Sequence, residues 1–137
     1  NQQIRLLIRE HHDSSLLILK DKLPVFKDLI FSDKAKVFYH DYEMVKGLNK
    51  YTTAIGWLTN SSMYDVTFTV KAISVDGIKA TRENVLAGEY KLISDYAFIY
   101  KKNKLTGLAR EFVDFIFSDD GREILANAGM VPVDRHE

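Results

Sequence analysis

The first sixteen residues have the pattern of a strand, a polar turn and the start of a helix. Residues Ile4 to Ile8 are mostly apolar, as expected for a buried strand. Asp13, Ser14 and Ser15 follow, and their side-chain oxygens can accept the backbone N–H groups that a helix start leaves without partners. An apolar helix face then begins at Leu16. This order predicts a strand that leads through a short loop into a helix.

The same segment holds the elements of an anion site. Arg9 stands at the end of the predicted strand, and its planar guanidinium can grip a tetrahedral oxyanion with several donors. The start of a helix also attracts anions, because its free N–H groups and its dipole point the same way. We therefore take Arg9, Ser14 and Ser15 as candidate ligand residues. Asp13 either caps the helix or accepts a proton from a bound acidic oxyanion, and a simple helix cap beside a surface arginine is the structural alternative.

Strand-like and helix-like segments alternate along the rest of the chain. A glycine inside one predicted strand, Gly56, suggests close approach by another backbone or a ligand, or else a bulge. The alternation predicts an α/β fold with helices flanking a mixed sheet. We expect strands at 36–39, 52–58, 66–75 and 96–101, and helices at 15–23, 25–30, from about 41, at 81–87, 105–116 and between 118 and 129.

Two of these segments have the clearest patterns. Residues 66–75 alternate between apolar and polar, which is typical of a half-buried strand. Residues 105–116 repeat apolar side chains at helical spacing, so they predict an amphipathic helix. We expect both segments to bury one face.

Composition excludes several classes of protein. The 137 residues include 19 Lys plus Arg and 19 Asp plus Glu, so the chain lacks the basic excess of non-specific nucleic-acid or membrane-surface binders. Without cysteine there is no disulfide and no thiolate site. No apolar run approaches the roughly 20 residues of a membrane span, and no signal peptide is recognisable. Because the sequence starts at Asn1, we expect a mature product, a trimmed one or a piece of a longer protein.

Residue types that could support catalysis or metal binding are present but poorly arranged. His11 and His12 are adjacent, so they point apart, and neither His40 nor His136 stands at a metal-ligand spacing from them. No Gly-x-Ser-x-Gly nucleophile motif accompanies the serines. The acidic pair at 119–120 fits the start of a helix. We therefore expect no enzyme activity, no metal site and no cofactor.

Four segments, in order, resemble segments of the substrate-binding proteins of ABC-type phosphate importers. Lys50 to Leu58 resembles their GAIGY strand, and Val70 to Thr81 is similar to their VKALKVNGVEPT segment. Leu86 to Leu92 resembles an SGxYPL segment, and Phe112 to Val133 is close to the ending FIDFxLSxEGQxIL…GYVPL. The resemblance covers Ile4 to Val133.

The resemblance also implies a ligand site. The family's opening strand and turn read roughly V-x-R-x-x-G-S-G-T, and its arginine, hydroxyls and helix-start amides hold the oxyanion. Arg9 matches the arginine and Ser14 or Ser15 matches the serine. The turn here is Glu10 to Asp13, without the family's glycines and threonine. The implied ligand residues are Arg9, Asp13, Ser14 and Ser15, and the implied ligand is a small oxyanion, phosphate by family default.

The implied fold is that of type 2 periplasmic-binding-protein-like proteins, with two α/β lobes and a ligand cleft between them. Residues 1–94 would be the second-lobe region carrying the anion loop, and 95–137 would return to the first lobe. Most of the first lobe, with its share of the site, would lie outside this sequence. We expect a partner chain, such as a second copy in a homodimer, or a swapped segment to cover the apolar stripe at 105–116.

The implied function is that of a solute-binding protein, or a part of one. It would capture the oxyanion in the periplasm or at the cell surface and deliver it to the membrane subunits of an ABC importer, with no cofactor and no nucleic acid. An alternative from another class is a non-catalytic sensory or interaction module of the same fold whose degenerate loop binds no ligand.

Overall fold

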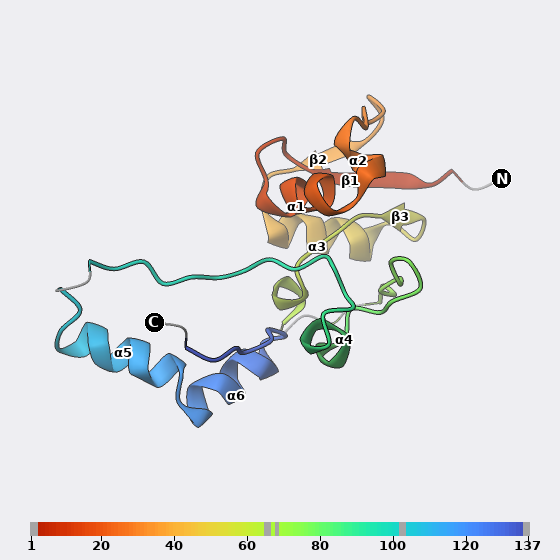
Figure 1. Ribbon diagram of the computed structural model, residues 1–137. Coiled ribbons are helices and arrows are strands. Elements are labelled where there is room, and N and C mark those ends of the chain that lie inside the picture. Colours follow the sequence, from red (N-terminus) through yellow and green to blue (C-terminus); the bar gives the residue numbers. More distant parts are fainter. Residues whose placement is uncertain (1–2, 65–66, 68, 102–103, 136–137) are drawn as a thin grey trace. The chain divides into compact units, whose positions relative to one another are not determined.

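The computed structural model describes residues 3–64, 67, 69–101 and 104–135. The chain forms two compact units, Asn1–Ser94 (unit 1) and Asp95–Glu137 (unit 2), whose elements are labelled in Figure 1. Which lobe each unit represents stays a prediction. Unit 1 contains β1 Arg5–Arg9, α1 Ser14–Lys22, α2 Pro24–Lys27, β2 Lys36–Phe38, α3 Asp41–Lys50, β3 Ala54–Ile55, η1 Asn60–Met63 and α4 Arg82–Leu86, and unit 2 contains α5 Leu108–Ile116 and α6 Asp119–Asn127.

A parallel sheet organises unit 1. Its order is β2-β1-β3, so β1 lies in the centre and the chain crosses from one side of β1 to the other between β2 and β3. The register pairs Arg9 with Phe38 and Arg5 with Ala54. Strands alternating with helices confirm the α/β class predicted from the sequence, and the sheet in the described residues is parallel rather than mixed.

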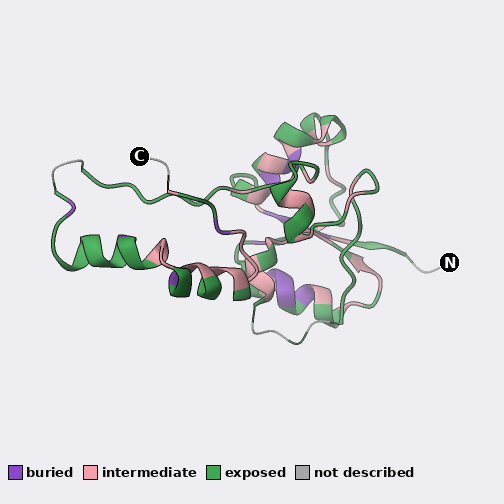
Figure 2. Cartoon of the chain, turned by 60° about the horizontal axis from the view of Figure 1, so that its bottom comes forward, coloured by how far each residue is buried: buried purple, intermediate pink, exposed green. Residues whose placement is uncertain are grey.

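The core of unit 1 forms where α3 packs on the sheet. Leu7 from β1 and Met44 from α3 are fully buried, and Phe38 at the end of β2 closes the cluster. Burying side chains of this size contributes roughly 1.5–3 kcal/mol each. Ile8 points to the opposite face, because strand side chains alternate, and it is also buried. Figure 2 shows α3 on one side of the strands and the α1–α2 pair on the other.

Gly56 confirms the expected close approach of another backbone. A Cβ at this position would lie 3.1 Å from the carbonyl oxygen of Leu7 and 3.3 Å from the sulfur of Met44. Glycine therefore lets the chain after β3 lie directly against the central strand and the core.

Two of the predicted strands are wrong. In the interval 66–75, Val66 and Phe68 lie outside the described residues, and the described remainder is not strand and ends in a single antiparallel bridge between Val75 and Ile78. Residues 96–101 are also not strand, and Ile99 is 98% exposed. A strand needs a neighbour for its N–H and C=O groups, and these segments find no partner strand within the described residues. The sequence pattern alone does not supply that neighbour.

The helices were predicted more accurately than the strands. Thr81 caps α4 and Ser118 caps α6, each at the predicted start of its helix, and their side chains accept the backbone N–H groups of Asn84 and Gly121. The helix expected at 25–30 is shorter and ends at Lys27. The helix expected from about 41 is α3, and its N-cap is His40. The 105–116 stripe becomes helical only from Leu108, since Gly107 at the N-cap has a positive φ of 55°.

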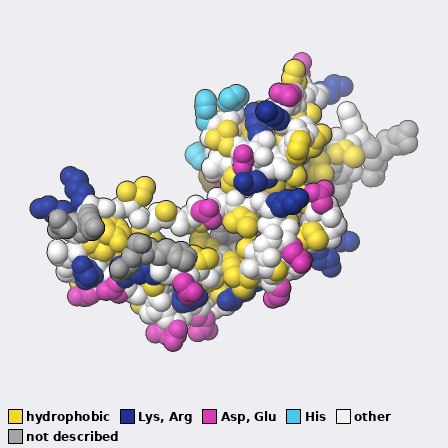
Figure 3. Space-filling model, in the orientation of Figure 1, with side chains coloured by type: hydrophobic (Ala, Val, Ile, Leu, Met, Phe, Trp, Pro, Cys, Tyr) yellow, Lys and Arg dark blue, Asp and Glu magenta, His cyan; other side chains and the backbone are white. Residues whose placement is uncertain are grey.

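Unit 2 is a helical pair with an exposed apolar surface. The pair packs tightly where α6 begins, since a Cβ on Gly121 would lie 2.0 Å from the carbonyl oxygen of Phe115. Along α5, Val113 is buried, whereas Leu108 is 81% and Phe112 is 55% exposed. Figure 3 shows apolar side chains at this surface. In the part of the chain that the structure describes, no helix has the length and apolar character needed to cross a bilayer.

Candidate functional site

The predicted anion site lies at the carboxyl edge of the sheet. Arg9 ends β1 beside Phe38, which ends β2, and the helices α1 and α3 begin just beyond these two strands. The sheet order changes direction at β1. In open α/β sheets, ligands bind outside the carboxyl ends of the strands at such a switch point. Arg9 is only 8% exposed, so a buried cation lies at the edge of the sheet where this rule expects a ligand to bind.

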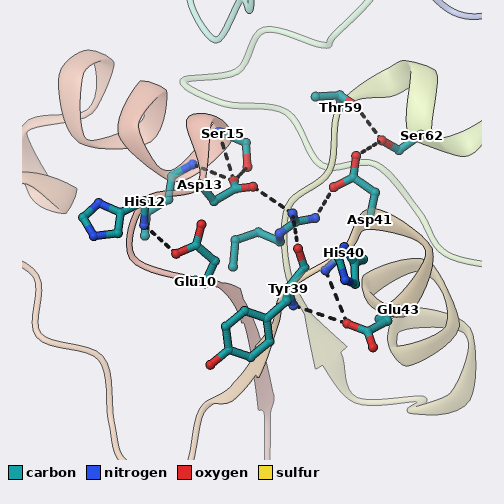
Figure 4. A network of polar contacts seen from close by, with 12 residues as sticks. Glu10, His12, Asp13, Ser15, Tyr39, His40, Asp41, Glu43, Thr59 and Ser62 are labelled. Carbon is teal, nitrogen blue, oxygen red and sulfur yellow. Dashed lines mark hydrogen bonds and ion pairs between the residues drawn. The ribbon is translucent and has the colours of Figure 1, made fainter.

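The Arg9 guanidinium lies between two carboxylates (Figure 4). Its Nη2 lies 2.9 Å from Oδ2 of Asp13 and donates to the carbonyl oxygen of Tyr39 at 3.0 Å, while Nη1 pairs with Oδ1 of Asp41. Its Nε is buried and has no hydrogen-bond partner among the described residues. A buried N–H without a partner is uncommon in folded proteins. Both terminal nitrogens of the guanidinium are therefore paired, and the Nε–H is a donor without a partner among the described residues.

Asp13 is the N-cap of α1. Its Oδ1 accepts the backbone N–H groups of Ser15 at 3.0 Å and Leu16 at 3.3 Å, and it also accepts the hydroxyl of Ser15. Its Oδ2 faces Arg9. The capping role considered from the sequence is thus present. One carboxylate also contacts an arginine, a hydroxyl and helix-start amides, which are the three donor types predicted for a bound oxyanion.

The two serines have different surroundings. Ser15 is half-buried, and its Oγ accepts the indole N–H of Trp57 at 3.1 Å. This hydrogen bond connects Ser15, in the first turn of α1, to Trp57 in the segment after β3. Ser14 is exposed and is the first residue of α1. The structure therefore brings Arg9, Asp13 and Ser15 together, whereas Ser14 stands beside them at the surface.

Sequence reasoning missed Asp41 and its neighbours. The second oxygen of Asp41 accepts the hydroxyl of Ser62 at 2.6 Å, and Ser62 lies 2.6 Å from the hydroxyl of Thr59. The signal was available, because Asp41 follows the end of β2 and lies at the start of α3, much as Asp13 follows the end of β1 and lies at the start of α1. Asp41 and Ser62 also line a hollow of ≈ 510 Å³. Its other lining residues are Tyr42, Val45, Lys46 and Asn49.

The other candidate residues form no further site in the described chain. No group of three potential metal ligands is found among the described residues, and His136 lies outside them. The His11 and His12 rings pack edge to face, with their centres 4.7 Å apart. Figure 3 shows histidine side chains at the surface of unit 1. The acidic pair at 119–120 opens α6, as expected.

Comparison with known protein sequences gives consistent relatives. Residues 1–120 match a family model described as a PBP superfamily domain. The phosphate-binding protein PstS of Bacillus subtilis is 41% identical over 81 residues, which are 58% of this chain and 26% of that protein. PstS 2 of Streptococcus agalactiae is 30% identical over 103 residues, which are 75% of this chain and 34% of that protein. The matches thus span about a third or less of these relatives.

Solved structures give the same result. A substrate-binding protein from Clostridium perfringens, assigned to phosphate ABC transport and solved with bound phosphate, has a TM-score of 0.74 and 26% identity. The match covers 96% of this chain and 52% of that one. A phosphate-binding protein of a phosphate ABC transporter from Streptococcus pneumoniae shares the fold, with a TM-score of 0.61 and 22% identity. The family match over residues 1–120, on a fold shared with these structures, shows that the chain belongs to the PBP superfamily.

Proposed function

We propose that this chain carries one wall of an oxyanion site, with phosphate as the ligand, in a solute-binding protein that serves an ABC importer. The observation that carries the proposal is Arg9, which is 8% exposed, at the carboxyl end of the central strand beside the start of α1. The relatives support it, because they are phosphate-binding proteins by name and one was solved with phosphate. These names do not favour the alternative of a sensory module that binds no ligand.

The proposed mechanism is binding without chemistry. Arg9 supplies a charge-assisted hydrogen bond through its unpaired Nε–H, and Ser15 and the first N–H groups of α1 add neutral donors. Ser14, exposed at the start of the same helix, adds a second hydroxyl donor. Closure of the second wall over the ligand removes water and strengthens these hydrogen bonds.

The proposal includes a location and partners. The protein acts outside the cytoplasm, in the periplasm or at the cell surface, and its partners are the oxyanion and the membrane subunits of the importer. It uses no cofactor and binds no nucleic acid. We propose that a second copy in a homodimer, or a swapped segment, covers the exposed apolar residues Leu108 and Phe112 of α5. Light scattering of the Leu108→Ser variant tests the second-copy case, since it should then be more monomeric than the unchanged protein.

Isothermal titration calorimetry on the full-length gene product that contains this sequence tests the ligand assignment. Titrants are phosphate and sulfate. We expect binding of phosphate, and we expect Arg9→Ala to abolish it, because the buried cation is lost. Arg5→Ala is the matched control, since Arg5 lies on the same strand at its other end and is exposed. The proposal fails if phosphate gives no heat with the unchanged protein, or if Arg9→Ala and Arg5→Ala bind equally well.

A further inference from the structure

The carboxylate of Asp13 occupies the donors that an oxyanion would use. Its Oδ1 accepts from Ser15 and Leu16, and its Oδ2 faces Arg9 at 2.9 Å. The Asp13 side chain is only 12% exposed, so it is turned into the site rather than toward solvent. Figure 4 shows this carboxylate between the first turn of α1 and the guanidinium.

An N-cap alone does not explain this arrangement. Serine and asparagine cap helices about as well as aspartate, and neither of them brings a charge. Here the second oxygen of the cap turns to a cation that already has Asp41 as a partner. Arg9 is buried and its Nε still has no partner in the described part of the chain, so the site retains a donor for a further acceptor.

We propose that Asp13 is an internal competitor for the oxyanion and thereby sets the affinity of the site, an inference that rests on the proposed function. While the Asp13 carboxylate stays at the helix start, it occupies the backbone N–H groups of Ser15 and Leu16, the Ser15 hydroxyl and Nη2 of Arg9. An oxyanion gains them only when the Asp13 side chain turns away. The apparent affinity is then the affinity of the open site multiplied by the fraction of molecules in which the site is open.

The charges act in the same direction. Two carboxylates, Asp13 and Asp41, contact one guanidinium, so the three groups together carry a net negative charge. A doubly charged anion that binds beside both carboxylates is repelled, and like-charge contacts are strongly unfavourable. Of the two, Asp13 is the one that also holds the helix-start donors. Asp13 is therefore the residue that sets the affinity, and Asp41 is a positioning residue for Arg9.

Two substitutions separate competition from capping. Asp13→Asn keeps the shape and a capping oxygen but removes the charge, and Asp13→Ser replaces the carboxylate by a hydroxyl that also caps. The matched control is Asp21→Asn, which removes an exposed carboxylate near the other end of α1 that pairs with Lys22. Each variant of the full-length gene product is titrated with inorganic phosphate and with sulfate by calorimetry, and circular dichroism checks that it is folded.

We expect Asp13→Asn and Asp13→Ser to bind phosphate at least about tenfold more tightly than the unchanged protein, the equivalent of about 1.4 kcal/mol. Asp21→Asn should leave the affinity unchanged. If the unchanged protein binds phosphate and both Asp13 variants bind it equally or more weakly, the competitor role is overturned and the proposed function stands. If neither the unchanged protein nor a folded Asp13 variant binds phosphate, both proposals fail. A purely structural role for Asp13 predicts weaker binding, which is the opposite sign.

Discussion

The carboxylate of Asp41, the first residue of α3, pairs with the guanidinium of Arg9, the last residue of β1. This ion pair joins the ends of two elements that are 32 residues apart in the sequence. It also fixes the guanidinium against the carboxyl edge of the sheet, where the carbonyl oxygen of Tyr39 accepts a further hydrogen bond. The orientation of the candidate ligand residue Arg9 on β1 thus depends on the first residue of α3.

Asp41→Ala should lower the free energy of unfolding by about 1–3 kcal/mol, because it removes a charged partner from a buried cation and an acceptor from Ser62. Urea denaturation followed by circular dichroism measures the loss. Asp21→Ala is the control. It breaks the exposed pair with Lys22, so we expect a change within about 0.5 kcal/mol. Equal effects of the two substitutions would contradict a structural role for Asp41.

The single tryptophan should report on the ligand site. Trp57 donates its indole N–H to Ser15 at 3.1 Å and stacks on Phe31 with ring centres 5.9 Å apart. An oxyanion that takes the Ser15 hydroxyl changes the surroundings of the indole, so phosphate should shift the tryptophan emission in a saturable way. Ser15→Ala should remove this shift and weaken binding about fivefold, since one neutral hydrogen bond is lost.

The control for the fluorescence experiment is Ser32→Ala. Ser32 accepts the backbone N–H of Lys34 in an exposed turn before β2, whereas the indole N–H of Trp57 donates to Ser15. Its titration curve should match that of the unchanged protein. A phosphate-dependent shift that persists in Ser15→Ala would show that Trp57 senses something other than the Ser15 hydroxyl.

Local patterns predicted the elements that depend on local physics. The strand before Arg9, the cap at Asp13 and the helices α4, α5 and α6 follow from apolar spacing and capping residues, which act within a few positions of the chain. The strands expected at 66–75 and 96–101 did not follow. Their alternation describes a half-buried surface, whereas a strand also requires a neighbour that the pattern does not specify.

The site shows the same division. The segment from Arg9 to Ser15 could be recognised because one strand–turn–helix unit contains it. Asp41, Ser62 and Trp57 could not be placed, since each reaches the site through tertiary structure: parallel pairing of β1 with β2 and β3, and the approach of η1 to α3. The competition between Asp13 and a ligand is likewise visible only in the contacts of its two oxygens.

Gly47 should be the residue that best fits the packing of α3 on the sheet. A Cβ there would lie 2.8 Å from the ring of Phe38 and 3.1 Å from a methyl group of Leu7, both in the core. Gly47→Ala gains about 1 kcal/mol of helix propensity, but overpacking costs about 1–3 kcal/mol. We therefore expect a net decrease in unfolding free energy, measured by urea denaturation. Lys46→Ala, on the exposed side of α3, should change it by less than about 0.5 kcal/mol.

Three cations gather around Tyr51 at the end of β1 opposite Arg9. The Arg5 guanidinium lies 4.1 Å from the centre of the Tyr51 ring, and the ammonium groups of Lys50 and Lys36 lie at 5.5 and 5.7 Å. The charge of Lys36, more than that of Lys50, lowers the pKa of Tyr51 below its ordinary value of 10.0. Positive charges stabilise the phenolate.

The lowered pKa of Tyr51 makes stability depend on pH in the alkaline range. Because the folded chain favours the phenolate, this contribution to the free energy of unfolding is present above the unfolded value of 10.0 and is lost as pH falls through the lower folded pKa. Absorbance titration at the tyrosinate band, taken as the difference from Tyr51→Phe, isolates the phenol. Lys36→Gln should move its pKa toward 10.0. Lys46→Gln should not, since Lys46 lies over the Tyr42 ring, and equal shifts in both variants would remove Lys36 as the cause.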